Sequence, residues 1–432
     1  MTLRCIRVVL AVAALATARA AAAQSIDLPS ARPSDTLFGS GPTGATQQLD
    51  VTLSVLGAYD TSLGDDLSNG IADPAVQVRG SFGGLGGGLN YSKKLRHGAF
   101  RLSENSSARY YTGNSELFGA QHSAGAGLDV SFDRTRLTLS QTIGYLPFYA
   151  FTLLPPLFTP DAGEVPAPAD HLITRRDERV SSSAVTLQYS FNQRTTLQAM
   201  TTFEIADFFH EASGVQSRAA AAHLSTRIAR GVSIVGGYGL IDSTYRVAGD
   251  GTRFRNHDIA FGLNIDRPLS VSRRTTISVT TGSTAVEDMS NTIQYHITAD
   301  ARLNHEFGRS WHATAAYRRA VETIVGFDRP FFANTVNLNL GGTLNRRVEL
   351  LFSGGGSSGE LSRYGPQTHT DSLSGSARLR VSLSRHASFT VNYLTYRYRF
   401  DQTLDLPVGL PLHLDRQALR VGIDLWCPLV RD

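Results

Sequence analysis

An alternation of apolar and polar side chains with a period of two runs from Leu49 to the end of the chain, and it limits the possible folds more than any other feature. Residues 373–383, 293–304 and 336–345 show it most clearly. Successive side chains of a strand point to opposite sides, so each such segment has one apolar and one polar face. The pattern predicts β-strands throughout.

About eighteen such segments can be counted, with boundaries good to about 2–4 residues. An even number suits a closed antiparallel barrel with both termini on one side. The expected strands span 48–60, 75–93, 98–112, 120–133, 135–149, 179–192, 194–208, 214–229, 231–246, 254–268, 274–285, 291–307, 310–324, 331–346, 348–359, 368–385, 387–401 and 413–428.

The connections between these segments alternate between short and long. Each short one contains arginine, as in Asp133-Arg134-Thr135 and Asn345-Arg346-Arg347, whereas the long ones include 150–178, 360–367 and 402–412. Tight periplasmic turns and longer extracellular loops are typical of outer-membrane barrels. We therefore expect an all-β, transmembrane, antiparallel up-and-down barrel of about 18 strands (16–18).

A soluble β-sandwich or propeller is the alternative fold. Its loops need not alternate in length, and barrel closure leaves no exposed strand edges among so many hairpins. Aromatic residues also gather near the expected strand ends, such as Phe132 and Trp426 by the short turns and Tyr59 and Phe400 by the long loops. They would form two girdles at the membrane surfaces, although aromatics favour strands in any case.

The N-terminus predicts export. Arg4 and Arg7 precede the short apolar run Val8 to Ala16, and Ala21 to Ala23 resemble a cleavage site. The expected organisation is a signal peptide over 1–23, a flexible periplasmic extension over 24–47 and an outer-membrane barrel over 48–432. The expected location is the outer membrane of a Gram-negative bacterium.

Composition excludes several classes of protein. Past the leader no stretch approaches the ~18 apolar residues of a transmembrane helix. The formal charge is +4 and the arginines are scattered, so no nucleic-acid partner is expected. Only Cys427 lies beyond the leader, which rules out an intrachain disulfide or a cysteine-based zinc site in the expected mature chain.

If the apolar faces meet lipid, the polar faces line the interior. A lumen with excess guanidinium would favour anionic solutes, whereas arginines paired with acids across strands would only stabilise a polar interior. The lumen-lining candidates are Arg101, Arg136, Arg227, Arg302, Arg318, Arg378, Arg380, Arg416, Arg420, Glu204, Asp258, Asp300 and Asp424, with acids in the minority.

Catalytic, cofactor and metal sites are not expected. Neighbours such as His257-Asp258 face opposite sides of a strand, and the glycine-rich run 83–88 lacks the lysine of a phosphate-binding loop. Asp170-His171 lies in the longest loop, where a dyad could form. That loop, 150–178, exceeds the usual connection length. It could narrow the lumen, cap its mouth or remain a solvated surface loop.

Several stretches resemble a known family. These are Gly308-Arg309-Ser310-Trp311, Gly326-Phe327-Asp328, Tyr396 to Phe400, and the closing run from Arg416 to Leu429. They are similar to outer-membrane β-barrel porins of acidobacteria and proteobacteria, often linked to exopolysaccharide export loci. The resemblance implies a porin-like protein with no catalytic residues. One departure is the C-terminus, Val430-Arg431-Asp432, where such barrels usually end on an aromatic residue.

The sequence thus predicts a pore, passive or weakly selective, for polysaccharide or anionic solutes. Its expected partners are outer-membrane lipid and the barrel-assembly machinery. The alternatives are a structural or glycan-binding barrel with a plugged lumen and, less favoured, an outer-membrane hydrolase acting from its loops.

Overall fold

The computed structural model describes residues 46–61, 80–111, 118–150, 172–208, 213–230, 232–247, 250–265, 275–287, 293–308, 310–322, 324, 327, 330–361, 369–401 and 412–431. The expected signal peptide and nearly all of the expected extension lie outside these residues, as do residues 151–171 of the longest connection.

Eighteen strands make up almost all of the described chain. They are β1 (Gln47–Asp60), β2 (Gly80–Leu95), β3 (Gly98–Tyr111), β4 (Phe118–Ser131), β5 (Thr135–Ala150), β6 (Leu172–Ser190), β7 (Thr195–Phe208), β8 (Gly214–Ala229), β9 (Val232–Val247), β10 (Asp250–Ile265), β11 (Thr275–Glu287), β12 (Ile293–Phe307), β13 (Trp311–Glu322), β14 (Phe331–Asn345), β15 (Val348–Leu361), β16 (His369–Ser382), β17 (Ala387–Phe400) and β18 (His413–Arg431).

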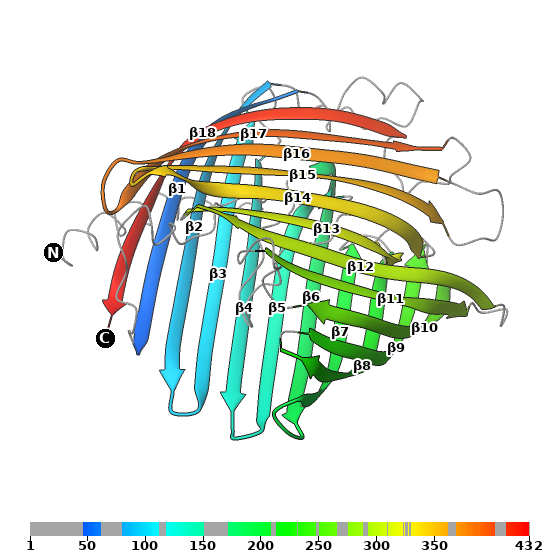
Figure 1. The fold of residues 1–432 in the computed structure, drawn as a ribbon. Coiled ribbons are helices and arrows are strands. Elements are labelled where there is room, and N and C mark those ends of the chain that lie inside the picture. The colour runs from blue at the N-terminus through cyan, green and yellow to red at the C-terminus, as the bar shows by residue number, and fades with distance from the viewer. Residues whose placement is uncertain are drawn as a thin grey trace.

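The strands form one closed wall (Figure 1). Each pairs antiparallel with the strands before and after it in the chain, and β1 pairs with both β2 and β18. The closing ladder runs from Gln48↔Arg431 to Asp60↔Ala418. This confirms the predicted all-β, up-and-down, eighteen-stranded barrel. In the described ranges no helix has the length and apolarity needed to cross a membrane.

Alternating burial separates an outer from an inner face. On β14, Val336, Leu338 and Leu340 are exposed while Asn337 and Asn339 are buried. Directly paired residues of neighbouring strands lie on the same face, so the register extends this assignment around the wall. The outer face is mainly apolar and the inner face polar, as the sequence pattern predicts.

Several strand boundaries differ from the predicted ones. The strand expected to begin at Arg179 begins at Leu172, so part of the expected loop 150–178 is β6. The strand expected to begin at residue 75 begins, among the described residues, at Gly80. The last strand continues to Arg431 instead of 428. These ends carry ladder pairs such as Ala150↔Leu172 and Gln48↔Arg431, which strand periodicity alone does not reveal.

Side chains in the short turns explain their tightness. Asn192 Oδ1 accepts hydrogen bonds from the backbone N–H groups of Arg194 (2.8 Å) and Thr195 (2.9 Å). Asn345 Oδ1 does the same for Arg347 (2.8 Å) and Val348 (3.0 Å). An asparagine side chain that mimics a backbone turn in this way reverses the chain in few residues. The turn after β12 uses Gly308 at a φ of 59°, which glycine adopts without steric cost.

Candidate functional site

The interior of the barrel is the candidate site, and the register places all thirteen predicted lumen-lining residues on the inner face. Asp424 pairs with buried Ser54 and Ser388, for example, and Arg380 with buried Thr390. Asp300 stands opposite Arg318, which in turn is opposite the buried Thr335. The same parity puts Arg101, Arg136, Arg227, Arg302, Arg378, Arg416, Arg420, Glu204 and Asp258 inside.

Four of these arginines form ion pairs on the inner face. Arg416 Nε donates to both carboxylate oxygens of Asp60 (2.9 and 3.1 Å), and both side chains are buried. Arg136 Nε donates in the same way to Asp129 (3.1 and 2.9 Å). Arg380 lies 3.3 Å from Glu349 and Arg318 lies 3.3 Å from Glu322. These contacts match the cross-strand pairing considered as the alternative from sequence.

Two further guanidinium groups, those of Arg109 and Arg420, lie close to the ring of the buried Phe82. Arg109 is fully buried, with its guanidinium carbon 5.0 Å from the ring centroid of Phe82. Arg420 lies 5.9 Å from the same ring. Both distances permit cation–π attraction, which strengthens when the cation is desolvated. The sequence pattern singled out Arg420 but neither Arg109 nor Phe82.

Other candidates have little or no side-chain pairing. Thr390 Oγ1 donates to Asp424 (2.5 Å) and Ser182 Oγ to Glu204 (3.4 Å). Among the described residues, the side chains of Arg227, Arg378, Asp258 and Asp300 make no hydrogen bond or ion pair. These four charges can therefore meet a solute without first breaking a salt bridge.

The expected excess of inward positive charge is wrong. Among the residues whose side chains the structure describes, the register turns inward six acids beyond those that sequence reasoning had placed inside, Glu349 among the latter, while it adds only Lys94 and Arg109 to the cations. Inward acids and bases are then about equal in number. The sequence signal existed, since each acid lies in phase with its strand's polar face. The added acids are Asp50, Asp60, Asp129, Glu178, Glu306 and Glu322.

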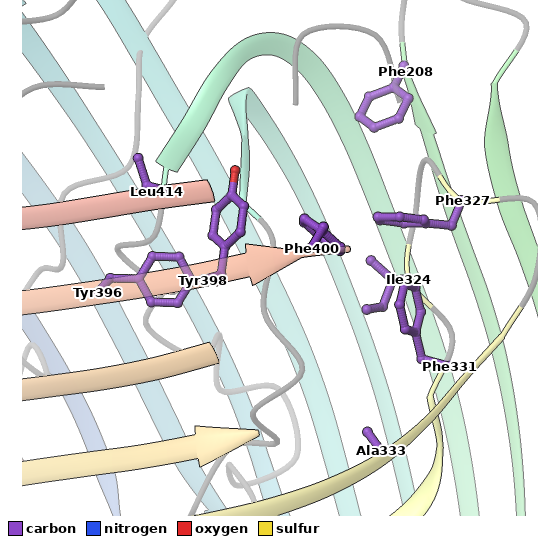
Figure 2. Close-up of a cluster of buried hydrophobic side chains, with 9 residues drawn as sticks. All are labelled: Phe208, Ile324, Phe327, Phe331, Ala333, Tyr396, Tyr398, Phe400 and Leu414. Atoms are coloured by element: carbon purple, nitrogen blue, oxygen red, sulfur yellow. The ribbon is translucent and has the colours of Figure 1, made fainter. Parts of the chain in front are cut away.

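An apolar cluster lies inside the barrel at the long-loop end (Figure 2). Phe327 follows β13, and its ring centroid is 4.8 Å from that of Phe331 and 5.9 Å from that of Phe400. Phe208 of β7 belongs to the same cluster, although β7 is far around the wall from β14 and β17. The members are Phe208, Ile324, Phe327, Phe331, Ala333, Tyr396, Tyr398, Phe400 and Leu414.

This cluster is a candidate constriction, because it joins distant parts of the wall across the interior. The sequence offered loop 150–178 as a constriction, a cap or a solvated surface loop, and residues 151–171 of that loop lie outside the described residues. The expectation that Phe400 joins an aromatic girdle facing the membrane is wrong, because the register pairs it with the buried Thr370 and turns it into this interior cluster. The alternation carried no signal that Phe327 would turn inward.

The structure offers little catalytic chemistry among its described residues. His257 faces outward and contacts the Tyr238 hydroxyl (2.8 Å), whereas Asp258 faces inward. Asp170 and His171 lie outside the described residues. No cluster of three or more metal-ligating side chains occurs in the parts of the chain that are described.

One polar cluster on the outer face was not predicted. Ser106 Oγ donates to Glu104 and lies 2.8 Å from His122 Nδ1. Their parity is that of exposed Leu102, so these side chains sit on the otherwise apolar surface of β3 and β4.

Comparison with known proteins gives structural likeness only. No protein-family profile and no curated protein sequence matches this chain. Similar solved structures include OpdQ of Pseudomonas aeruginosa, at 12% identity, with 89% of this chain and 98% of that chain covered and a TM-score of 0.45. OccAB4 of Acinetobacter baumannii gives 12% identity, 90% and 100% coverage and 0.45. The siderophore receptor PirA of Pseudomonas aeruginosa gives 9%, 89% and 81%, and 0.44. The fold assignment rests on the closed strand ladder itself.

Proposed function

We propose that this protein is a porin-like channel of the bacterial outer membrane, passive and weakly selective, with no enzymatic activity. The observation that carries the proposal is a closed barrel with an apolar exterior and a charged interior. Neighbouring strands of a closed barrel bond to one another and leave no open sheet edge, which a lipid environment demands. Barrels of sixteen to eighteen strands are wide enough for an aqueous lumen.

The edge of the apolar exterior supports a membrane location. On β18 the outward residues from Leu425 to Leu419 are apolar, and then Gln417 and Asp415 follow. Asp415 pairs on the outer face with Arg397 of β17. Arg253–Asp242 and Arg246–Asp207 form similar pairs near the long-loop ends of β7, β9 and β10. Charges facing lipid are costly at mid-bilayer and tolerated near its surface, so these pairs would mark one boundary of the membrane.

Topology supports an orientation. Both described ends of the chain lie on the side of the short turns, which is the periplasmic side in outer-membrane barrels. The exported chain would need a leader such as the one expected over 1–23, and assembly would require the barrel-assembly machinery. The Phe327 cluster would then narrow the extracellular half of the lumen.

The balance of inward charge argues for weak selectivity. Anionic solutes would be attracted by Arg227 and Arg378 and repelled by Asp258 and Asp300. We therefore propose small polar solutes, anions included, as cargo. Polysaccharide passage stays a finer proposal supported only by the family resemblance.

A second candidate function is a plugged barrel that binds glycans or other partners through its loops. The apolar cluster around Phe327 favours it, because buried aromatic side chains from distant strands leave less room for water at that level.

Planar-bilayer recording distinguishes the two. The chain lacking residues 1–23 should give discrete conductance steps, and Phe327→Ala should enlarge them because it removes a ring from the constriction. Phe352→Ala, on the outer face of β15, should leave the step size unchanged. Silence from both wild type and Phe327→Ala, in protein shown by circular dichroism to be folded, would reject the channel. Glycan binding without conductance would favour the plugged barrel.

A further inference from the structure

The wall of the barrel has a gap in its hydrogen bonding between β12 and β13, and the β4–β5 ladder also ends early, at His122↔Tyr145. The β12–β13 ladder runs from Phe307↔Trp311 to Ala299↔Arg319 and stops there. Ala320, Val321 and Glu322 pair only with β14, and residues 293–298 pair only with β11, although all of these residues are described. Continuation of the ladder would have joined Thr298 to Ala320 and Ile297 to Val321. The two strands separate instead.

The end of the β13–β14 hairpin has moved inside the wall at this gap. By register, Val321 and Phe332 belong to the outer face, one position from the inward Glu322 and Phe331. Yet Phe332 stacks on His296, with ring centroids 4.3 Å apart, and His296 lies on the inner face opposite the fully buried Thr284. The outward side of β14 at Phe332 can contact the inward side of β12 at His296 only if the end of the β13–β14 hairpin lies inside the wall formed by β11 and β12.

A second contact points the same way. Val321 packs against a cluster made of Ala206, Val215, Tyr245, Phe254 and Val286. Phe254 and Val286 lie on the inner faces of β10 and β11, since they pair with buried Ser243 and Asn256. The end of the β13–β14 hairpin therefore packs against the inner face of β9 to β11. The part of β13 from Trp311 to Arg319, which still pairs with β12, remains in the wall.

The gap carries unsatisfied polar atoms. Arg319 Nε and His296 Nε2 are buried, and neither has a hydrogen-bond partner among the described residues. The Arg319 guanidinium carbon lies 4.9 Å from the Phe332 ring centroid. Buried polar groups without partners are costly and uncommon in native proteins. A ligand that accepts hydrogen bonds would satisfy Arg319 Nε, and it would also satisfy His296 Nε2 in the tautomer that carries the proton there. Arginine favours carboxylate and phosphate partners.

The surroundings of the gap are apolar on both sides. On the outside, Tyr295 and Ile297 of β12 are 76% and 65% exposed. Inside lie the Val321 contacts and, at the same long-loop end, the Phe327 cluster. A fully hydrated solute would gain no favourable contacts with these apolar side chains. A molecule with an acidic head and an alkyl tail would place the head at Arg319 and His296 and the tail against the apolar side chains.

We propose that the gap between β12 and β13 is a lateral portal for single-tailed amphipathic acids, connecting the lumen with the outer leaflet. Arg319 and His296 receive the acidic head, Phe332 closes the gap when it is empty, and the tail extends to the Phe327 cluster or to lipid. The inference rests on the proposed function in needing the barrel to sit in a membrane. It does not need the lumen to conduct ions.

The test uses tryptophan fluorescence quenching by bromododecanoate in lipid vesicles. The background protein carries Trp311→Phe and Trp426→Phe, which removes both native tryptophans. Phe327→Trp then places a reporter inside the barrel, and Phe352→Trp places a matched reporter on the lipid-facing surface of β15. Bromododecyl phosphate and bromododecanol serve as a second acid and an uncharged probe.

The interior reporter should show saturable quenching by the carboxylate. Arg319→Gln should weaken the apparent affinity at least tenfold, and Phe332→Ala should speed the onset. Quenching at the Phe352→Trp reporter should increase with probe concentration without saturating, and neither Arg319→Gln nor Phe332→Ala should change it. Saturation by the phosphate as well would identify the head group as any small anion rather than a carboxylate.

Non-saturable quenching at the interior reporter, or equal saturation by the uncharged alcohol with no effect of Arg319→Gln, would overturn the portal. Ion conductance separates this result from the proposed function, and it is measured on proteins without the Phe327→Trp reporter, because that substitution enlarges a ring of the candidate constriction. Arg319→Gln alone should leave the wild-type conductance steps intact. Saturable acid binding, with both wild type and Phe327→Ala silent, would reject the pore while keeping the portal.

Discussion

At the scale of single residues, the inner face shows how a barrel tolerates buried charge. Arg416 and Asp60 are both buried and satisfy each other through several hydrogen bonds. They lie at the β1–β18 seam, where Asp60 belongs to the last ladder pair, Asp60↔Ala418, and Arg416 comes two residues beyond it on β18. A buried pair need not be more stable than an apolar replacement, but losing one partner leaves an uncompensated charge.

Asp60→Asn should therefore lower the free energy of unfolding by about 3–5 kcal/mol, because Arg416 would stay buried without its carboxylate. The double variant Asp60→Asn/Arg416→Gln should recover much of the loss. Urea unfolding in lipid vesicles measures both. Asp242→Asn, which breaks the more exposed pair with Arg253, is the control and should cost much less. Equal losses for Asp60→Asn and Asp242→Asn would contradict the argument.

At the scale of elements, each strand is defined by the contrast between its faces. On β11, Val279 is outward and 48% exposed, while its neighbour Thr280 is inward and stands opposite Asp300 of β12. Glu104 and His122 break this rule on β3 and β4, and their mutual contacts with Ser106 satisfy part of their polarity. Gln141, Ser181 and Ser183 break it in the same way on β5 and β6, where their side chains hydrogen-bond to one another. Around Val279 the outer face follows the rule, because its ladder partners Leu263 and Ala301 are apolar.

Val279→Arg should lower the free energy of unfolding in lipid by about 2–4 kcal/mol, the cost of a lipid-facing arginine near mid-bilayer. Thr280→Arg should cost far less, because the new guanidinium would face Asp300 across the ladder. The two substitutions differ by one position in the chain, so strand propensity cancels between them. Unfolding curves in lipid vesicles measure both free energies. A larger loss of stability for Thr280→Arg than for Val279→Arg would show that the inner and outer faces are inverted.

At the scale of the whole molecule, the described part of the interior holds nearly equal numbers of acids and bases, although the chain carries a formal charge of +4. The inward acids Asp50, Asp129 and Glu178 offset arginines that looked like an excess when strands were considered one at a time. Ion selectivity of a wide lumen follows the summed charge of its lining. A nearly balanced lining therefore predicts a weak preference.

A bilayer separating two KCl concentrations should accordingly give a reversal potential near zero. Arg227→Gln/Arg378→Gln should shift it toward cation preference, and Asp258→Asn/Asp300→Asn toward anion preference, since none of these side chains is neutralised by a described ion pair. A strongly anion-selective wild type, or double variants that shift the potential in the same direction, would refute the charge balance.

The amino-acid sequence by itself determined the barrel. A two-residue period fixes which side chains share a face, and the alternation of short and long connections fixes which strands are neighbours. For this reason the strand number and the inward position of Arg101 through Arg420 could be predicted. Both are local properties, decided within one strand or one hairpin.

Only the tertiary structure decided what the interior contains and where its wall opens. The Phe327 cluster, the Arg416–Asp60 pair and the contact of Phe332 with His296 join residues from strands that are distant in the chain or leave the regular ladder. Periodicity says which face a side chain occupies but not what stands opposite it across the lumen. Nor can it show that a hairpin leaves the wall, because the residues of β13 keep their alternation after their hydrogen bonds to β12 end.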